Sequence, residues 1–463
     1  MASTYKTPGV FIEEISIFPP SVAAVETAIP AFIGYTEMAK RKEAGDLNME
    51  PWRITSLKEF EQYFGKAVNE TGITVTIDTA ATPVETLAKI ENPSVFRMYY
   101  SLQAFFANGG GPCYIVSVGT YPAPGSPPAL ADLQAGLEKV EKVDEVTLLV
   151  FPDSSGLLSA ADYYSLHGEA LDQCMDLQDR FTVMDIWVDP ADDSMNHNIA
   201  LMRSTLGGTT DRLKYGAVYY PHVLTIQDYQ YDPNVINVNI DGTDDFLENW
   251  KDSNNAGYNI AKAAITQIEM EMPVSAAVVG VYARVDNNRG VWKAPANETI
   301  DLAIRPLVPI NKNEQADLNV DAVGGKSVNA IRAFAGRSPA LIWGSRTLAG
   351  NDNEWRYVPV RRFFNMAEES IKNATEQFVF EPNDANTWVR VRGMIENFLT
   401  LQWRAGALAG ATPEDAFFVK VGLGATMTAL DILEGRMIVE IGMAVVRPAE
   451  FIILRFSHKM QES

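Results

Sequence analysis

The middle of the chain alternates between short apolar segments and longer amphipathic ones. The apolar segments carry hydrophobic residues at consecutive positions, which predicts strands at residues 31–35, 113–118, 146–151, 181–187 and 215–220. The segments between them predict helices at residues 95–106, 130–140, 160–176 and 197–205. Strands that are apolar on both faces and alternate with helices indicate a mostly parallel α/β sheet covered on both sides. Residues 40–95 are instead expected to form an irregular surface region, apart from a helix that begins near Ser56.

The last third of the chain has a different pattern. Apolar residues recur at intervals of three and four in residues 363–378 and again in residues 388–399, which predicts two amphipathic helices. The second helix is expected to end near one of two glycines, Gly406 or Gly410. Two final strands are predicted at residues 436–446 and 450–457. The fold class is therefore a multidomain combination of α/β and α+β structure, with a mostly parallel α/β middle domain.

The first twenty residues contain a strand with no local partner. The apolar segment at residues 10–17 follows Pro8 and Gly9 and precedes Pro19 and Pro20. Proline has no backbone donor and restricts the residue before it, so a hairpin with nearby residues is disfavoured. An extended run of this length covers roughly 27 Å, enough to cross the sheet of a neighbouring molecule. We therefore expect the hydrogen-bond partners of this arm to lie far away, in this subunit or in another.

Composition and charge narrow the classes of function. A chain of 463 residues with 47% hydrophobic composition is globular and forms several domains. No apolar run is long enough to span a bilayer and no signal peptide is evident, so we expect cytoplasmic synthesis. The net charge of −21 argues against nucleic acid or an anionic membrane as the main partner. Residues 340–463 carry 13 Lys and Arg against 15 Asp and Glu, whereas residues 1–339 carry 25 against 44. The last quarter is thus balanced, which suits an interfacial domain, and the remainder suits a solvated exterior.

The candidate catalytic and ligand-binding motifs all fail on spacing or context. Gly-Lys-Ser at residues 325–327 lacks the earlier glycine of a phosphate-binding loop, and the glycines at 109–111 lie between a helix and a strand, the reverse of the phosphate-binding order. Residues 237–248 have the spacing of a calcium loop, but they begin with Asn237 and follow an alternating, strand-like segment. The remaining polar candidates have no catalytic or metal-ligand spacing: His167, His197, His222, His458, Glu13-Glu14, Asp192-Asp193 and Glu368-Glu369. We expect no catalytic site, no cofactor and no metal, and we expect Cys113 and Cys174 to be buried small hydrophobic residues.

Several stretches resemble the contractile tail sheath proteins of phages, tailocins and related injection systems, and the resemblance covers nearly the whole chain. Residues 5–14, Tyr-Lys-Thr-Pro-Gly-Val-Phe-Ile-Glu-Glu, are similar to the opening Pro-Gly-Val-Tyr-x-Glu-Glu of that family, with Phe11 in the place of Tyr. Ser345 stands where Ala is common in the family. Further similar stretches follow in order at residues 280–286, 289–297, 343–348, 354–362, 380–384 and 447–453. Residues 21–35 and 105–116 most resemble the extracellular contractile injection systems.

This resemblance implies a non-enzymatic machine part. Sheath subunits of the family stack as six-fold rings around an inner tube and are held by an inner domain built from both chain ends. The implied domains are an N-terminal strand-donating arm at 1–20, an acidic outer α/β region at 21–339 and an inner C-terminal domain at 340–463. The implied partners are further copies of the chain, the inner tube protein, and the baseplate and terminal cap proteins, with no nucleic acid and no direct membrane insertion. The particle is expected to assemble in the cytoplasm and to be released from the cell.

The arm and the C-terminal strands supply the residues that the resemblance places in strand exchange between subunits. These are Val10, Phe11, Ile12, Glu13, Glu14, Ile15, Ile17, Met437, Val439, Ile441, Phe451, Ile453 and Arg455. Two alternatives remain open from the residues themselves. One is a static shell or scaffold protein that exchanges strands without contracting. The other is a nucleotide-dependent α/β enzyme that uses the arm only to dimerise.

Overall fold

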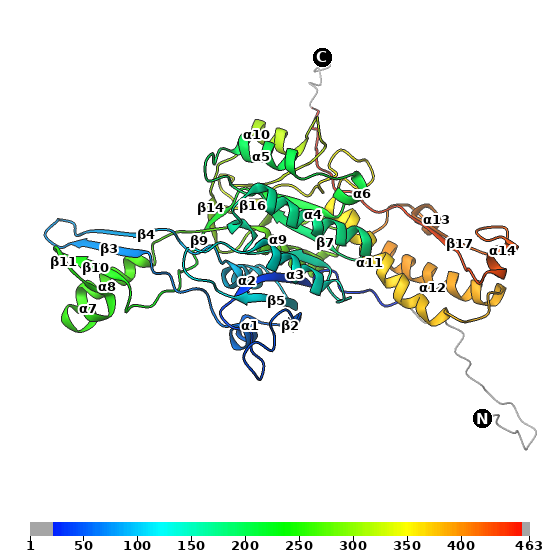
Figure 1. The fold of residues 1–463 in the computed structure, drawn as a ribbon. Helices are drawn as coiled ribbons and strands as arrows, with labels where there is room; N and C mark the ends of the chain where they lie inside the picture. The colour runs from blue at the N-terminus through cyan, green and yellow to red at the C-terminus, as the bar shows by residue number, and fades with distance from the viewer. Residues whose placement is uncertain (1–21, 456–463) are drawn as a thin grey trace, which may run out of the picture. The chain divides into compact units, whose positions relative to one another are not determined.

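A computed structural model describes residues 22–455, and the predicted strand at residues 10–17 lies outside this range. The chain divides into two compact units (Figure 1). The larger unit contains Glu26–Ala367 together with residues 447–455, and the smaller unit contains residues 22–25 and Glu368–Val446. These units begin and end at other residues than the predicted domains, whose functional division stays a prediction. Among the described residues, no helix combines the length and apolar composition needed to cross a membrane.

The larger unit is built on a nine-stranded sheet with the order β13-β16-β15-β8-β7-β6-β1-β5-β2. The six consecutive strands from β15 to β5 are parallel to one another. The other three pair antiparallel: β2 at the edge beside β5, β16 beside β15, and β13 at the opposite edge beside β16. The predicted mostly parallel sheet is therefore confirmed, and all five predicted strands are present. The bounds are β1 Pro30–Thr36, β2 Trp52–Ile54, β5 Cys113–Thr120, β6 Leu148–Val150, β7 Phe181–Asp185, β8 Gly216–Tyr220, β13 Glu298–Thr299, β15 Asn329–Arg332 and β16 Leu341–Ile342.

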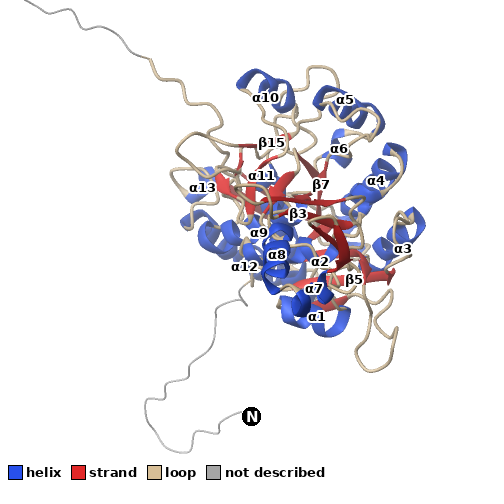
Figure 2. Ribbon diagram, turned by 90° about the vertical axis from the view of Figure 1, so that its left-hand side faces the viewer, coloured by secondary structure: helices blue, strands red, loops and turns tan. Residues whose placement is uncertain are grey.

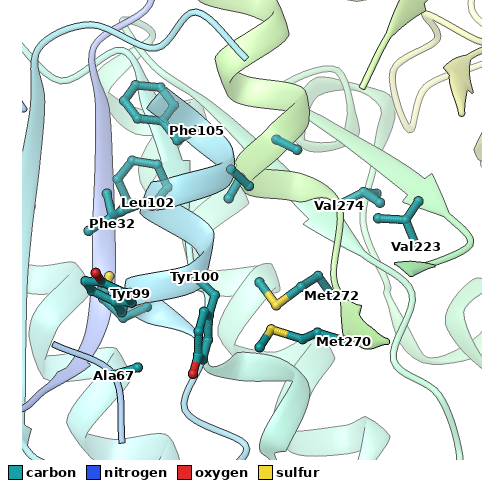
Figure 3. Packing of buried hydrophobic residues seen from close by; sticks show 14 of the residues in the cluster. Phe32, Ala67, Tyr99, Tyr100, Leu102, Phe105, Val223, Met270, Met272 and Val274 are labelled. Atoms are coloured by element: carbon teal, nitrogen blue, oxygen red, sulfur yellow. The ribbon is translucent and has the colours of Figure 1, made fainter. Parts of the chain in front are cut away.

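Helices cover both faces of this sheet (Figure 2). Along β1, Ala31 and Ile33 belong to one buried apolar cluster and Phe32 belongs to the other, as the two-residue period of a strand requires. Figure 3 shows the second cluster, in which Phe32 lies near Leu102 and Phe105. The helices on the side of Ile33 are α3 Leu130–Val140, α4 Ala160–Leu177 and α5 Met195–Thr205, and those on the side of Phe32 are α2 Met98–Ala107 and α9 Ser275–Arg289.

The larger unit also contains a three-stranded antiparallel sheet with the order β12-β9-β14. The strands of this sheet and four further helical segments are β9 Val223–Thr225, β12 Met270–Met272, β14 Ala303–Pro306, α1 Leu57–Phe64, η1 Ser154–Gly156, α6 Thr210–Leu213 and α10 Lys312–Asn319. Helix α1 begins where the sequence predicts it, because the Ser56 hydroxyl accepts a hydrogen bond from the Glu59 backbone N–H.

A separate four-stranded sheet, with the order β11-β10-β3-β4, overturns the expectation that residues 40–95 are irregular. The pattern of β4 is weak because its residues are mostly exposed, and β3 pairs in parallel with β10, which lies more than a hundred and fifty positions away in the chain. Residues 237–246 form the β10–β11 hairpin, and Asp241 and Gly242 at its turn have positive φ angles of 51° and 84°. The elements are β3 Ile73–Asp78, β4 Glu85–Ile90, β10 Asn237–Ile240, β11 Thr243–Phe246, α7 Leu247–Ser253 and α8 Asn255–Ile265.

The smaller unit contains the predicted helix pair. Helix α11, Val358–Thr375, runs from the larger unit into the smaller one, and α12, Ala385–Arg404, follows after a short 3-10 turn. The other elements are η2 Glu376–Phe378, α13 Pro413–Ala416, β17 Phe417–Val421, α14 Ala429–Leu433 and β18 Val439–Met443. Residues 450–455 form no strand here, contrary to the pattern, because a strand needs a hydrogen-bonded neighbour and none of residues 22–455 supplies one.

Candidate subunit-interface site

The two-stranded sheet of the smaller unit has open edges. Strands β17 and β18 pair antiparallel from Phe417 opposite Met443 to Val421 opposite Val439, and the opposite charges of Lys420 and Glu440 face each other across the pair. In the described part of the chain, neither strand has a second neighbour in a sheet. Each therefore presents a row of backbone groups that a further strand can pair with.

Apolar side chains around these edges are unusually exposed. On the sheet and its flanks, Phe418, Leu423 and Leu433 are 44%, 58% and 83% exposed, and most exposed large hydrophobic residues of the described chain lie after residue 378. The inner side of the sheet differs, because Val419 is buried and α12 packs against β17. An apolar exterior beside open strand edges is typical of a surface that becomes covered on assembly.

The predicted interface residues fall into three groups. The seven N-terminal ones, Val10 to Ile17, lie outside the described residues. Val439 and Ile441 lie on β18, opposite Val421 and Val419, and Met437 is half-buried just before that strand. Phe451, Ile453 and Arg455 lie in the irregular segment 451–455, where all side chains are exposed. Their role in strand exchange stays a prediction.

Two ion pairs of the larger unit, each with a buried arginine, were not found from the sequence. Arg346 binds Glu450 with an Nη2–Oε2 distance of 2.6 Å, and Arg362 binds Asp286 with an Nη2–Oδ2 distance of 2.6 Å. The sequence separations of 104 and 76 residues leave no local pattern that could reveal either pair. Their common feature is that each contacts a segment close to one end of the described chain.

The residues considered as catalytic or ligand-binding candidates lie in environments that suit a structural role. Burial lowers the pKa of His167 to about 3, so its imidazole is neutral. The Asp321 carboxylate accepts backbone N–H groups from Val323, Gly324 and Lys326, which folds the Gly-Lys-Ser loop into a tight turn. Among residues 22–455, no three His, Cys, Asp or Glu side chains are grouped as metal ligands require. Both cysteines are free and buried, as predicted.

Comparison with known proteins identifies the family. Residues 350–459 match the phage tail sheath C-terminal domain. The chain is 23% identical over 203 residues to the tail sheath protein of Enterobacteria phage T4, a match that covers 38% of this chain and 30% of that protein. The match thus spans less than a third of the length of this curated relative.

Solved structures match over the full length. A chain of the contracted anti-feeding prophage helical sheath is 32% identical, with a TM-score of 0.66 and coverage of 98% of this chain and 100% of that chain. A chain of the contracted PVC sheath complex, an extracellular contractile injection system, is 30% identical, with a TM-score of 0.66 and coverage of 99% of both. A chain of the anti-feeding prophage baseplate structure is 32% identical, with a TM-score of 0.65 and coverage of 99% and 100%. The chain therefore belongs to the contractile tail sheath protein family.

Proposed function

We propose that this chain is the repeating subunit of a contractile sheath, which polymerises as stacked six-membered rings around an inner tube and shortens to drive that tube through a target envelope. The observation that carries the proposal is the β17–β18 sheet, whose edges pair with no further strand of residues 22–455 and are bordered by exposed apolar side chains. Similarity along the full chain to subunits of contracted sheaths supports it.

Strand exchange is the proposed linkage between subunits. The arm at residues 10–17 and the C-terminal segment from Phe451 onward each add to the β17–β18 sheet of a neighbouring copy. Backbone hydrogen bonds depend little on side-chain identity, so such a linkage can hinge without breaking while the α/β units reorient. In this arrangement the acidic residues 21–339 lie outward and the balanced residues 340–463 lie inward, against the tube.

The proposed partners are therefore further copies of this chain, the inner tube protein, and the baseplate and terminal cap proteins. Contraction is the relaxation of a metastable extended lattice into one that buries more surface. Assembly takes place in the cytoplasm before release of the particle. Electron micrographs of the polymer test this directly, because a contractile sheath has two helical lattices, one longer and narrower, whereas a static shell has one.

Removal of the arm tests strand donation. We expect a variant that lacks residues 2–20 to be a soluble, folded monomer that does not polymerise, because the larger unit makes its own core without these residues. Ile12→Pro removes one ladder donor and should also impair assembly, whereas Thr4→Pro, outside the strand, is the matched control. Normal tubes from the deletion variant would refute donation by the arm, and unaltered assembly of Ile12→Pro would refute pairing through the Ile12 backbone N–H.

A further inference from the structure

A half-buried polar cluster around the buried Arg346 holds the Glu450 carboxylate. Arg346 donates to it from Nε at 2.9 Å and from Nη2 at 2.6 Å, Asn319 Nδ2 donates at 2.8 Å, and the Tyr357 hydroxyl donates at 3.1 Å. Both carboxylate oxygens therefore have two donors, and the arginine contact is bidentate. We call Glu450, Arg346, Asn319 and Tyr357 the Glu450 clasp.

The guanidinium nitrogens of Arg346 all have hydrogen-bond acceptors as well. The Arg346 side chain is 5% exposed, and its remaining Nη1 donates to the carbonyls of Asn319 at 3.1 Å and Gly350 at 3.3 Å. Burial alone would raise the pKa of Glu450, but the hydrogen bonds from Arg346 and Asn319 and the charge of Arg346 outweigh it and lower that pKa. A fully paired, ionised cluster of this kind fixes the position of the backbone that carries it.

The partners of Glu450 lie at or beside regular elements of the larger unit. Asn319 ends α10, and Tyr357 immediately precedes α11 and forms a backbone bridge with Arg346. The chain around Glu450 differs, because residues 447–455 are irregular and Phe451 to Leu454 are 71–80% exposed. Between residues 447–455 and the rest of the described chain, the hydrogen bonds all end on the Glu450 carboxylate.

The N-terminal end of the described chain has a corresponding attachment. The Asp286 carboxylate accepts hydrogen bonds from Arg362 and from the Thr27 hydroxyl, the latter at 2.6 Å. Arg362 also donates to the Thr27 carbonyl at 2.8 Å. Near each end of the described chain, a buried arginine thus binds a carboxylate of the larger unit: Arg346 binds Glu450, and Arg362 on α11 binds Asp286.

We propose that the Glu450 clasp is the attachment point from which the C-terminal segment is presented to a second copy of this chain. The inference rests on the proposed exchange of that segment. With the clasp closed, the segment from Phe451 starts at a fixed place on the larger unit, which lowers the entropy cost of docking. A pull on the docked segment then reaches the larger unit at Glu450 instead of being taken up by the irregular residues 447–449.

The first test uses the purified full-length monomer. Because the native cysteines are buried, spin labels can be placed at Ala449→Cys, beside the clasp, and at Ser204→Cys, exposed on α5. Pulsed electron paramagnetic resonance should give a narrow distribution of distances between the two labels in the doubly labelled parent protein. With Glu450→Gln added, the distribution should broaden. Tyr357→Phe, which loses a single hydrogen bond, should broaden it less and keeps the test open should Glu450→Gln not fold.

The matched control is Glu434→Gln, which removes an exposed ion pair with Arg436 and should leave the distribution narrow. An equally narrow distance distribution with Glu450→Gln, or equal broadening with Glu434→Gln, would overturn the proposal that the clasp fixes the start of the C-terminal segment. This measurement requires no polymer, so its result is independent of the proposed sheath function.

The second test measures assembly of the unlabelled variants. Loss of charge-assisted hydrogen bonds should raise the protein concentration needed for polymerisation by about tenfold or more with Glu450→Gln, with the melting temperature measured in parallel to show that the fold persists. Normal assembly of folded Glu450→Gln would overturn the proposal. If the parent protein forms no polymer under any condition, the sheath function fails, and the spin-label result still decides whether the clasp holds the segment.

Discussion

Arg362→Met should destabilise the larger unit more than most single substitutions. Arg362 on α11 and Asp286 on α9 have side chains that are 3% and 5% exposed, and two hydrogen bonds of 2.6 and 3.1 Å join them. The guanidinium also lies 4.6 Å from the centre of the Tyr282 ring. Methionine keeps much of the aliphatic volume but leaves the Asp286 carboxylate buried without its cation.

The expected cost follows from these contacts. Removal of one partner of a buried ion pair typically costs about 3–5 kcal/mol, because the remaining charge is uncompensated. Asp286 keeps its 2.6 Å hydrogen bond from the Thr27 hydroxyl, which offsets part of that loss. We therefore expect the free energy of unfolding to fall by about 3–4 kcal/mol.

Urea unfolding followed by tryptophan fluorescence measures this loss, with the slope of the transition checked for each variant. Arg362→Met combined with Asp286→Leu removes both charges and should recover most of the stability, because the desolvation penalty disappears with them. Thr27→Val should cost only about 1 kcal/mol. A loss below about 1 kcal/mol for Arg362→Met, or a double variant as unstable as the single one, would refute the electrostatic argument.

Two further predictions concern the core of the larger unit. Burial raises the pKa of Asp153 from 3.8 to about 6 although three backbone N–H groups donate to it, so the folded state binds a proton more readily than the unfolded one. Its contribution to stability should therefore rise by about 2 kcal/mol as the pH falls from about 7 to about 4, and Asp153→Asn should remove that rise from urea titrations; an unchanged pH dependence would contradict this. Gly280→Ala on α9 places a methyl group 2.4 Å from the Phe105 carbonyl oxygen on α2 and should cost about 1–3 kcal/mol, whereas Gly393→Ala on α12, where nothing lies within 4 Å, should stabilise by up to about 1 kcal/mol. Equal effects of the two glycine substitutions in urea unfolding would show that close helix packing is not the cause.

Five strands of the large sheet, β1, β5, β6, β7 and β8, were predictable because their signal is local, whereas β2, β13, β15 and β16, of two to four residues each, were not predicted. A strand buried on both faces is apolar at nearly every position, as in β1 and β8, so the sequence itself marks it. The same holds for α11 and α12, whose apolar residues repeat with the helical period. The four-stranded sheet was missed for the opposite reason, because β4 is largely exposed and the parallel neighbour of β3 is β10, which is distant in the sequence.

The sequence by itself thus determined the parallel α/β architecture, the two C-terminal helices, the absence of catalytic spacing and the resemblance to tail sheath proteins, since each depends on residues close together in the chain. Only the tertiary structure decided which residues form the attachments at Glu450 and Asp286, because their partners lie 104 and 76 positions away and nothing in either local pattern points to the other. It also decided that β18 pairs with β17, while residues 450–455 are irregular and pair with no strand of the described chain. A strand is defined by its hydrogen-bonded neighbour, and a neighbour is a property of the folded or assembled chain and not of the segment.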